Sequence, residues 1–231
     1  IEKYDNLIVV QTFSKSRSMA GSRIGFAISN EKVIKYLNDV KYSVRRGPFV
    51  LCNDLKTVTF ERGTTQIAEN LFLGCTGLEE ITLPETLTII ETSAFEQCLN
   101  LKSIDVPDHV TKIDSHAFDR CLSLKDVELS KGLTYIGVSA FAKTAIESIN
   151  IPKSLDSCGY SYSYEDYVLN DVEYSVGNGP FVLCDNLKTV TFEEGATQVP
   201  DTVFRGCTGL EKIVIPEGVT VIESYAFDDA L

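Results

Sequence analysis

The stretch that decides the fold reads Leu101-Lys-Ser-Ile-Asp-Val-Pro-Asp-His-Val-Thr-Lys-Ile-Asp-Ser-His-Ala-Phe-Asp-Arg-Cys121, and the chain repeats it. Cysteines and Ala-Phe pairs both return at intervals of 23 residues. The cysteines of this series are Cys52, Cys75, Cys98 and Cys121, followed by Cys184 and Cys207. A fixed period of roughly 20 to 50 residues predicts a solenoid, in which each unit buries its apolar face against its neighbours. A solenoid builds a surface, so binding is expected before catalysis.

Each position of the unit has a physical role. The first apolar positions alternate as in a strand with one buried face, and they are Leu101, Ile104 and Val106. Pro107 lacks an amide hydrogen and is expected to end that strand. Val110 and Ile113 are expected to point inward from the opposite wall of the coil. Ala117 and Phe118 predict a short helical turn with the ring inside, and Cys121 closes the coil as a small apolar side chain.

The leading strand residue can be followed along the chain. The series is Leu37, Leu55, Leu78, Leu101, Leu124, Ile146, Leu169, Leu187 and Leu210. Two of its intervals are shorter than the others, and they begin at the similar segments 37–44 and 169–176. Gly-Pro-Phe-Val-Leu-Cys likewise occurs at 47–52 and 179–184, so both repeated strings are displaced by the same distance along the chain. We infer an internal duplication, with a six-coil block that restarts near residue 169.

The motif Leu-x-x-Ile-x-Ile-Pro-x-x-Val-x-x-Ile-x-x-x-Ala-Phe-x-x-Cys resembles the leucine-rich repeats of the BspA type over residues 44–231. The resemblance implies a solenoid with a parallel β-sheet on its concave face. It also implies a bacterial surface or secreted protein that binds host or microbial partners. The coil from Ile146 departs from the motif, because Tyr162-Ser163 replaces Ala-Phe and Asp166 replaces Cys. We therefore expect this coil to be the loosest.

Residues 1–43 do not carry the repeat, and they predict a short α/β cap. Segment 6–14 is an apolar, β-branched run typical of a buried strand, and segment 25–28 predicts a second strand. Asn30 is a plausible N-cap for an amphipathic stretch that favours a helix. Whether residues 37–42 are helix or strand stays open, since the duplication favours strand and the amphipathic pattern favours helix.

Thr12-Phe-Ser-Lys15, followed by Ala20-Gly-Ser-Arg23-Ile-Gly25, is similar to the cofactor-lysine region of histidinol-phosphate aminotransferases. The resemblance implies that Lys15 forms the Schiff base with pyridoxal phosphate. It also implies that Ser14 and Arg23 contact the phosphate and that Thr12 lines the strand leading to it. A lysine amine traps the aldehyde, and a guanidinium forks onto phosphate oxygens.

The same resemblance requires groups that this segment lacks. Such enzymes use an Asp on the pyridine nitrogen, an aromatic ring on the cofactor, a glycine-rich helix start and an Arg for the substrate carboxylate. A lysine without its electron sink cannot run transamination. We therefore expect a non-enzyme without a cofactor, in which residues 1–43 cap the first coil. The alternative is a fragment of a pyridoxal-phosphate-dependent aminotransferase that carries a repeat insertion.

The charge is uneven along the chain. Residues 1–43 hold seven Lys and Arg against four acids, and residues 44–231 hold 14 against 29. Phosphate binding needs clustered Lys and Arg, so nucleic acid is excluded as a partner. No apolar run is long enough to cross a membrane. The repeat resemblance implies a secreted or surface location, and the aminotransferase alternative implies the cytoplasm.

The cysteines and histidines predict structure rather than chemistry. Six cysteines share one repeat position, so a buried column of reduced thiols is expected, although stacked coils would also bring the sulfurs within reach of disulfides. Cys158 stands apart and is expected to be the exposed thiol. His109 and His116 are seven residues apart on different faces of a coil, which is a poor metal pair.

Two surfaces are candidates for binding a protein or a glycan. The outward strand positions form columns, in which the middle coils present Asp105, Asp126 and Glu128 together. These carboxylates could bind a basic segment of a protein or, loosely, a cation, or they could form an ordinary solvated face. Tyr160, Tyr162 and Tyr164 alternate, which would put three rings on one face of an extended segment. Ring packing that repairs an irregular coil explains these tyrosines equally well.

Overall fold

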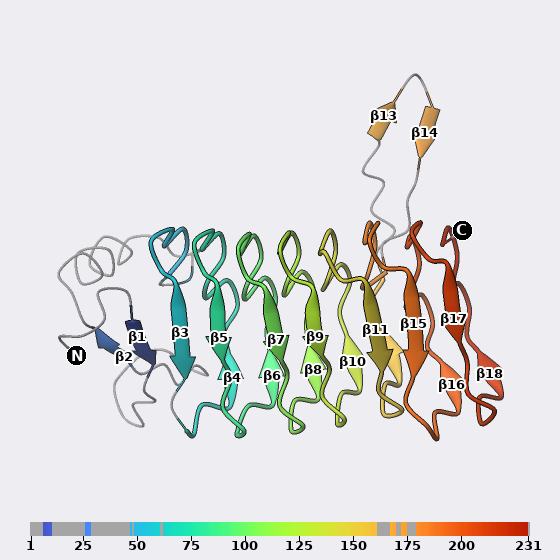
Figure 1. Ribbon diagram of the computed structural model, residues 1–231, viewed down its shortest axis with the longest axis horizontal. Helices are drawn as coiled ribbons and strands as arrows, with labels where there is room; N and C mark the ends of the chain where they lie inside the picture. Colours follow the sequence, from blue (N-terminus) through green and yellow to red (C-terminus); the bar gives the residue numbers. More distant parts are fainter. Residues whose placement is uncertain are drawn as a thin grey trace.

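The repeats stack as successive coils of an elongated solenoid in the computed structural model (Figure 1). The structure describes residues 7–10, 26–28, 47, 49–60, 62–160, 167–169, 172–174 and 179–230. Each coil contributes one longer strand and one two-residue strand, because the apolar alternation breaks at a turn and resumes on the other wall. The fold predicted from the repeat is therefore confirmed.

The longer strands lie side by side in one row, hereafter the long-strand face (Figure 1). They are β3 (Thr57–Phe60), β5 (Glu80–Thr82), β7 (Ser103–Asp105), β9 (Asp126–Glu128), β11 (Ser148–Ile151), β15 (Thr189–Phe192) and β17 (Lys212–Val214). Their pairings are parallel and join equivalent positions, such as Thr57 with Glu80 and Ser103 with Asp126. The sequence period thus sets the strand register.

The two-residue strands form the opposite wall. They are β4 (Gln66–Ile67), β6 (Ile89–Ile90), β8 (Lys112–Ile113), β10 (Tyr135–Ile136), β12 (Ser157–Cys158), β16 (Gln198–Val199) and β18 (Val221–Ile222). The first five form one parallel sheet, and β16 pairs with β18. Val110 and Ile113 are fully buried, as predicted for residues that point inward from this wall.

A column of stacked phenylalanine rings fills the interior. Neighbouring rings are 5.2–5.8 Å apart between centroids, and their planes diverge by no more than 25°. The column is Phe49, Phe72, Phe95, Phe118, Phe141, Phe181, Phe204 and Phe227. Stacked pairs add about 0.5–1.5 kcal/mol each beyond the burial of the rings. The column therefore couples each coil to both neighbours.

The segment around Phe118 is a chain of turns rather than the short helical turn that its sequence predicts. His116 and Arg120 adopt left-handed φ angles of 56° and 58°, which interrupt a right-handed helix. Alternate amides donate to the next coil, as in Phe118 N–H to Ala140 O at 2.7 Å, while Ala117 N–H donates to Asp114 O within its own coil. The turns thus hold neighbouring coils together, which a helix with internal hydrogen bonds would not do.

The N-terminal segment contains both predicted strands. β1 (Leu7–Val10) and β2 (Phe26–Ile28) pair antiparallel, and β1 pairs in parallel with β3. The two strands therefore extend the long-strand row at its N-terminal side. The expected helix after Asn30 and the cap boundary at residue 43 lie outside the described residues and stay predictions.

The prediction of a coil led by Leu169 is wrong. β13 (Tyr167–Leu169) and β14 (Val172–Tyr174) form an antiparallel hairpin that projects from the solenoid (Figure 1). β11 pairs directly with β15, which shows that the solenoid passes over this segment. Leu169 pairs with Val172 across Asn-Asp in the sequence, residue types that favour tight turns. This local pairing replaces stacking on a neighbouring coil.

The coil from Ile146 is also more regular than expected. Its Ala-Phe position is filled by Pro180-Phe181, after the hairpin, rather than by Tyr162-Ser163. Phe141 N–H donates to Pro180 O, and the Phe141 and Phe181 rings stack at 5.2 Å. Cys184 takes the closing position predicted for Asp166, and its side chain is fully buried. The insertion therefore interrupts the sequence of this coil but not its packing.

Candidate interaction surfaces

The long-strand face carries two columns of outward side chains in register. One column runs through Thr57, Glu80, Ser103, Asp126, Ser148, Thr189 and Lys212. The other runs through Thr59, Thr82, Asp105, Glu128, Asn150, Thr191 and Val214. The strand pairings join neighbours within each column, as the repeat predicts. Side chains in these columns are exposed or half-buried, so the face is open to a partner.

The three predicted carboxylates come together on this face. Asp105 pairs with Glu128 across β7 and β9, and Asp126 lies two residues before Glu128 on the same side of β9. All three residues are exposed. In the described part of the chain, none of them forms an ion pair, whereas other acids of the solenoid do. The face thus holds a concentration of uncompensated negative charge.

The start of the long strands shows the contrasting arrangement. Glu79 lies 3.0 Å from the ammonium groups of both Lys56 and Lys102, which come one repeat before it and one repeat after it. Hydrogen bonds from Lys102 and Lys56 lower the pKa of Glu79. Lys125 with Glu147 and Lys188 with Glu211 continue this rim ladder. Sequence analysis missed the ladder, although the repeat spacing of its charges could have revealed it.

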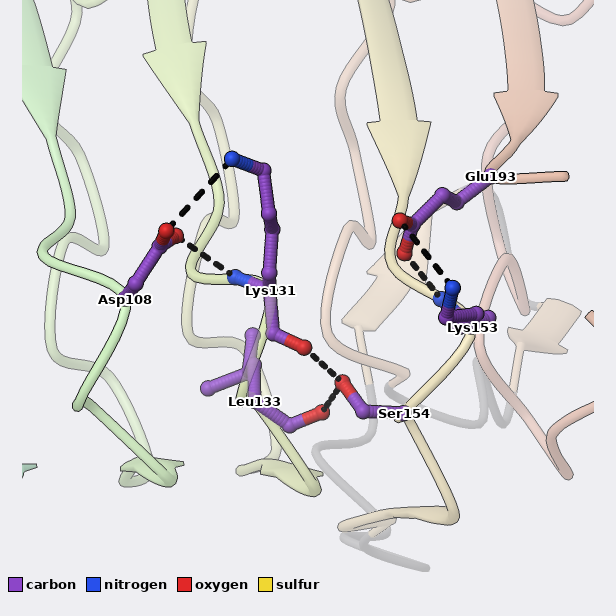
Figure 2. Close-up of polar contacts among 6 residues, drawn as sticks. All are labelled: Asp108, Lys131, Leu133, Lys153, Ser154 and Glu193. Atoms are coloured by element: carbon purple, nitrogen blue, oxygen red, sulfur yellow. Dashed lines mark hydrogen bonds and ion pairs between the residues drawn. The ribbon is translucent and has the colours of Figure 1, made fainter.

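Acids in two of the turns after the long strands are also paired with lysines (Figure 2). Asp108 accepts hydrogen bonds from the backbone N–H of Lys131 at 3.2 Å and from its Nζ at 3.4 Å. The backbone hydrogen bond is the main reason that the pKa of Asp108 is lowered. Glu193 accepts from the Lys153 amide and lies 3.6 Å from its Nζ. The acidic face is therefore bordered on both edges by paired charges.

The wall of two-residue strands has a small polar hollow of about 230 Å³. Lys112 lies in it, 2.7 Å from Asp114 and with its ammonium 5.4 Å from the centre of the Tyr135 ring. Gln66 and Glu91 also line it and are hydrogen-bonded to each other. Binding sites for small molecules are usually larger, at about 300–1,000 Å³, and mostly apolar. The hollow is therefore a weaker candidate than the long-strand face.

The repeat region matches the family model described as BspA type Leucine rich repeat region, over residues 43–170 and 158–230. The chain belongs to the BspA-type leucine-rich repeat family. Its fold is similar to that of the T. pallidum leucine-rich repeat protein, with a TM-score of 0.55, 26% identity and 72% of each chain covered. The pneumococcal vaccine antigen PcpA shares the fold at a TM-score of 0.52 and 23% identity, over 77% of this chain and 49% of that one.

The first residues of this BspA-type chain have different relatives. Residues 1–45 match the model of class I and II aminotransferases. They are 69% identical over 42 residues to histidinol-phosphate aminotransferase of Brachyspira hyodysenteriae, and 56% identical over 48 residues to that of Lactococcus lactis subsp. cremoris. These matches cover 18% and 21% of this chain but only 12% and 14% of the relatives. Thr12, Ser14, Lys15 and Arg23 lie outside the described residues, so their cofactor roles stay predictions.

The tyrosine surface of the BspA-type chain is described only in part. Tyr160 is 49% exposed. Tyr162 and Tyr164 lie outside the described residues. The backbone register pairs Tyr167 with Tyr174 across the hairpin. Recognition by the tyrosine-rich insertion therefore stays a prediction.

The cysteines form the expected interior column with one correction. Cys75, Cys98, Cys121, Cys184 and Cys207 are fully buried, and all seven cysteines are thiols. Cys158 was predicted to be exposed, but it is only 6% exposed. The reason is that Cys158 occupies the inward position of β12, where its equivalents are isoleucines. Cys52, at the start of the column, is the partly exposed thiol.

The two histidines have different surroundings. His116 Nδ1 is 3.4 Å from a carboxylate oxygen of Asp119, and this hydrogen bond raises the pKa of His116. His109 is exposed in the turn after β7. The described residues contain no group of three or more His, Cys, Asp or Glu arranged to hold a metal ion. They also contain no helix with the length and apolar character that crossing a membrane requires.

Proposed function

We propose that this chain is a non-catalytic recognition module that binds a basic segment of a protein partner at a bacterial surface. The observation that carries the proposal is the set of Asp105, Asp126 and Glu128, three exposed carboxylates in adjacent register without an ion-pair partner among the described residues. At the two edges of this face, the acids Glu79 and Asp108 are paired with lysines. Complementary charge mainly sets specificity and the association rate of such an interface.

The parallel solenoid suits this role because its spacing is regular. Equivalent side chains of adjacent strands lie about 4.8 Å apart, so carboxylates on neighbouring coils can meet successive cations of an extended or helical segment. The body of the chain is a solenoid, and the aminotransferase match is confined to residues 1–45. Both observations support binding over catalysis.

The test compares two triple variants against a lysine- and arginine-rich peptide probe. Asp105→Asn, Asp126→Asn and Glu128→Gln together remove the acidic group and should weaken binding about tenfold at low salt, since exposed ion pairs contribute about 0.2–1 kcal/mol each. The matched control is Glu85→Gln, Glu194→Gln and Glu217→Gln, three exposed acids in the turns after the long strands.

Both triple variants change the net charge equally, so non-specific attraction would affect them alike. The proposal expects the control to bind like the original chain, and it expects added salt to abolish the difference. Equal weakening in the two variants would reject the long-strand face as the binding surface. Titration calorimetry gives the dissociation constants, and circular dichroism verifies that each variant is folded.

The second candidate function is that of an aminotransferase fragment, favoured by the 69% identity of residues in this segment to a histidinol-phosphate aminotransferase. When bound, pyridoxal phosphate would supply the electron sink that amine chemistry needs. Added pyridoxal phosphate should then give a visible aldimine absorbance that Lys15→Ala abolishes. The recognition proposal expects no Lys15-dependent band.

A further inference from the structure

The thiol column has a distinct first member. Buried cysteines of the column donate their S–H to a phenylalanine carbonyl. Cys75 Sγ lies 2.9 Å from Phe49 O, and Cys98, Cys121 and Cys207 also pair with the phenylalanine 26 residues earlier. Cys184 pairs with Phe141, which lies 43 residues earlier because the hairpin is inserted between them. Cys52 begins the column and has no cysteine before it. It is partly exposed, whereas the other six cysteines are buried. Cys52 is thus the thiol that a dissolved reagent reaches first.

Cys52 and Cys75 are neighbours across two hydrogen-bonded coils. Leu51 N–H donates to Leu73 O at 2.8 Å, and Phe49 N–H donates to Leu71 O at 3.3 Å. Adjacent coils at about 4.8 Å fall within the Cα separation of about 4.4–6.8 Å that disulfides require. The side-chain interaction between the two thiols lowers the pKa of Cys52 and raises the pKa of Cys75. The accessible sulfur is therefore also the one that ionises first.

We propose that Cys52 and Cys75 form a thiol–disulfide exchange site that reacts with low-molecular-weight disulfides. The Cys52 thiolate attacks one sulfur of the disulfide, forms a mixed disulfide and releases the other half as a thiolate. The Cys75 thiol then loses its proton and attacks the Cys52 sulfur, which displaces the second half. The two protein thiols are oxidised to one disulfide, and the reagent is reduced to two thiols.

The rest of the column lacks this combination. Cys98 and Cys121 are fully buried, and burial raises the pKa of Cys98. Thr144 takes the next position and lies 3.4 Å from the sulfur of Cys184, so it separates Cys121 from the later thiols. An accessible thiol next to a second thiol thus occurs at the N-terminal start of the column. The site would lock the first coil to the second.

The test treats the folded chain with oxidised glutathione at mildly alkaline pH and maps the products by mass spectrometry. The expected product is a Cys52–Cys75 disulfide that a reducing agent reverses. Cys75→Ser should stop the reaction at a Cys52–glutathione mixed disulfide, and Cys52→Ser should prevent both products. Cys98→Ser is the matched control and should give the Cys52–Cys75 disulfide at the original rate.

A second measurement does not depend on any variant. Brief alkylation of the original chain with N-ethylmaleimide should modify Cys52 at least about tenfold faster than Cys98, because a buried thiol reacts only through local opening. Alkylation of both at the same rate would overturn the proposal. So would a lasting mixed disulfide on Cys52 of the original chain with Cys75 still reduced.

Discussion

Removal of residues 161–178 is expected to leave the solenoid intact, because the coil around the insertion already closes like its neighbours. The Phe141 and Phe181 rings stack at 5.2 Å with planes 7° apart. The uninterrupted pair Phe118 and Phe141 stacks at 5.2 Å and 10°. The deletion joins Tyr160 to Gly179 and gives Ile146 and Leu187 the regular repeat spacing.

The size of the effect follows from loop closure. In the regular coil, three residues separate Ile136 from Ala140, whereas 21 residues separate the equivalent positions Cys158 and Pro180. The entropic cost of closing a loop grows as (3/2)RT times the logarithm of its length, so the sevenfold shorter connection favours folding by about 1.7 kcal/mol. The deletion variant should therefore be at least as stable as the original chain.

Urea unfolding followed by far-ultraviolet circular dichroism measures the difference in unfolding free energy. A matched control removes an equally long part of the regular repeat, 104–121, and with it Phe118 from the interior column. That variant should lose at least about 3–5 kcal/mol, the usual cost of truncating one buried phenylalanine to alanine. A loss above about 1 kcal/mol for the 161–178 deletion would refute the reasoning, since it exceeds what an unneeded loop contributes.

Three further tests use substitutions in the interior and at one surface group. Phe118→Ala should destabilise the fold by about 3–5 kcal/mol and Phe227→Ala by clearly less, since Phe118 is fully buried between two rings and Phe227 stacks on one. Equal losses in urea unfolding would contradict the stabilising role of the ring column. Gly77→Ala should lower the free energy of unfolding by about 1–3 kcal/mol, because the new Cβ would overlap a backbone oxygen of the preceding coil. Gly218→Ala is the control and should cost less in urea unfolding, because its Cβ would lie 3.1 Å from the nearest atom. Because the pKa of His116 is raised in the folded state, its contact with Asp119 adds stability that is complete below the unfolded pKa of about 6.5 and is lost as the pH rises through the folded pKa. His116→Asn should therefore flatten the pH dependence of the urea unfolding midpoint. An unchanged pH profile would count against the contact.

The regular coils could be predicted from sequence because every packed position recurs. Leu101, Val110 and Phe118 return with the same spacing, and each is fully buried against its equivalents. Stacking identical coils requires no knowledge of distant contacts, since each unit touches only its neighbours. The strand register, the buried thiol column and the three outward carboxylates could therefore be predicted from the period together with the residue type at each position.

The errors arose where a prediction used the spacing alone, although the other buried residues of a coil were missing from the sequence. Leu169 continues the series of leading residues, yet no Ala-Phe pair or inward isoleucine accompanies it before Gly179. Without those side chains a coil has little to bury, and a local hairpin pairs the strand instead. Cys158 was wrongly predicted to be exposed because it stands apart from the other cysteines. Its position in β12, in register with Ile136, is an inward one.

The end of the duplicated segment marks where the chain enters the stack of coils, and its start does not mark the beginning of a coil. Residues 37–52 and 169–184 both end in Gly-Pro-Phe-Val-Leu-Cys. The described residues of this shared ending occupy the same place in both copies, with Phe49 and Phe181 in the ring column and Cys184 in the thiol column that Cys52 begins. The phenylalanine of this ending contacts the next coil in both copies, through its ring and its carbonyl oxygen, although different sequences precede the duplicated segment. One solenoid can therefore follow an aminotransferase-like segment at one copy and a projecting hairpin at the other.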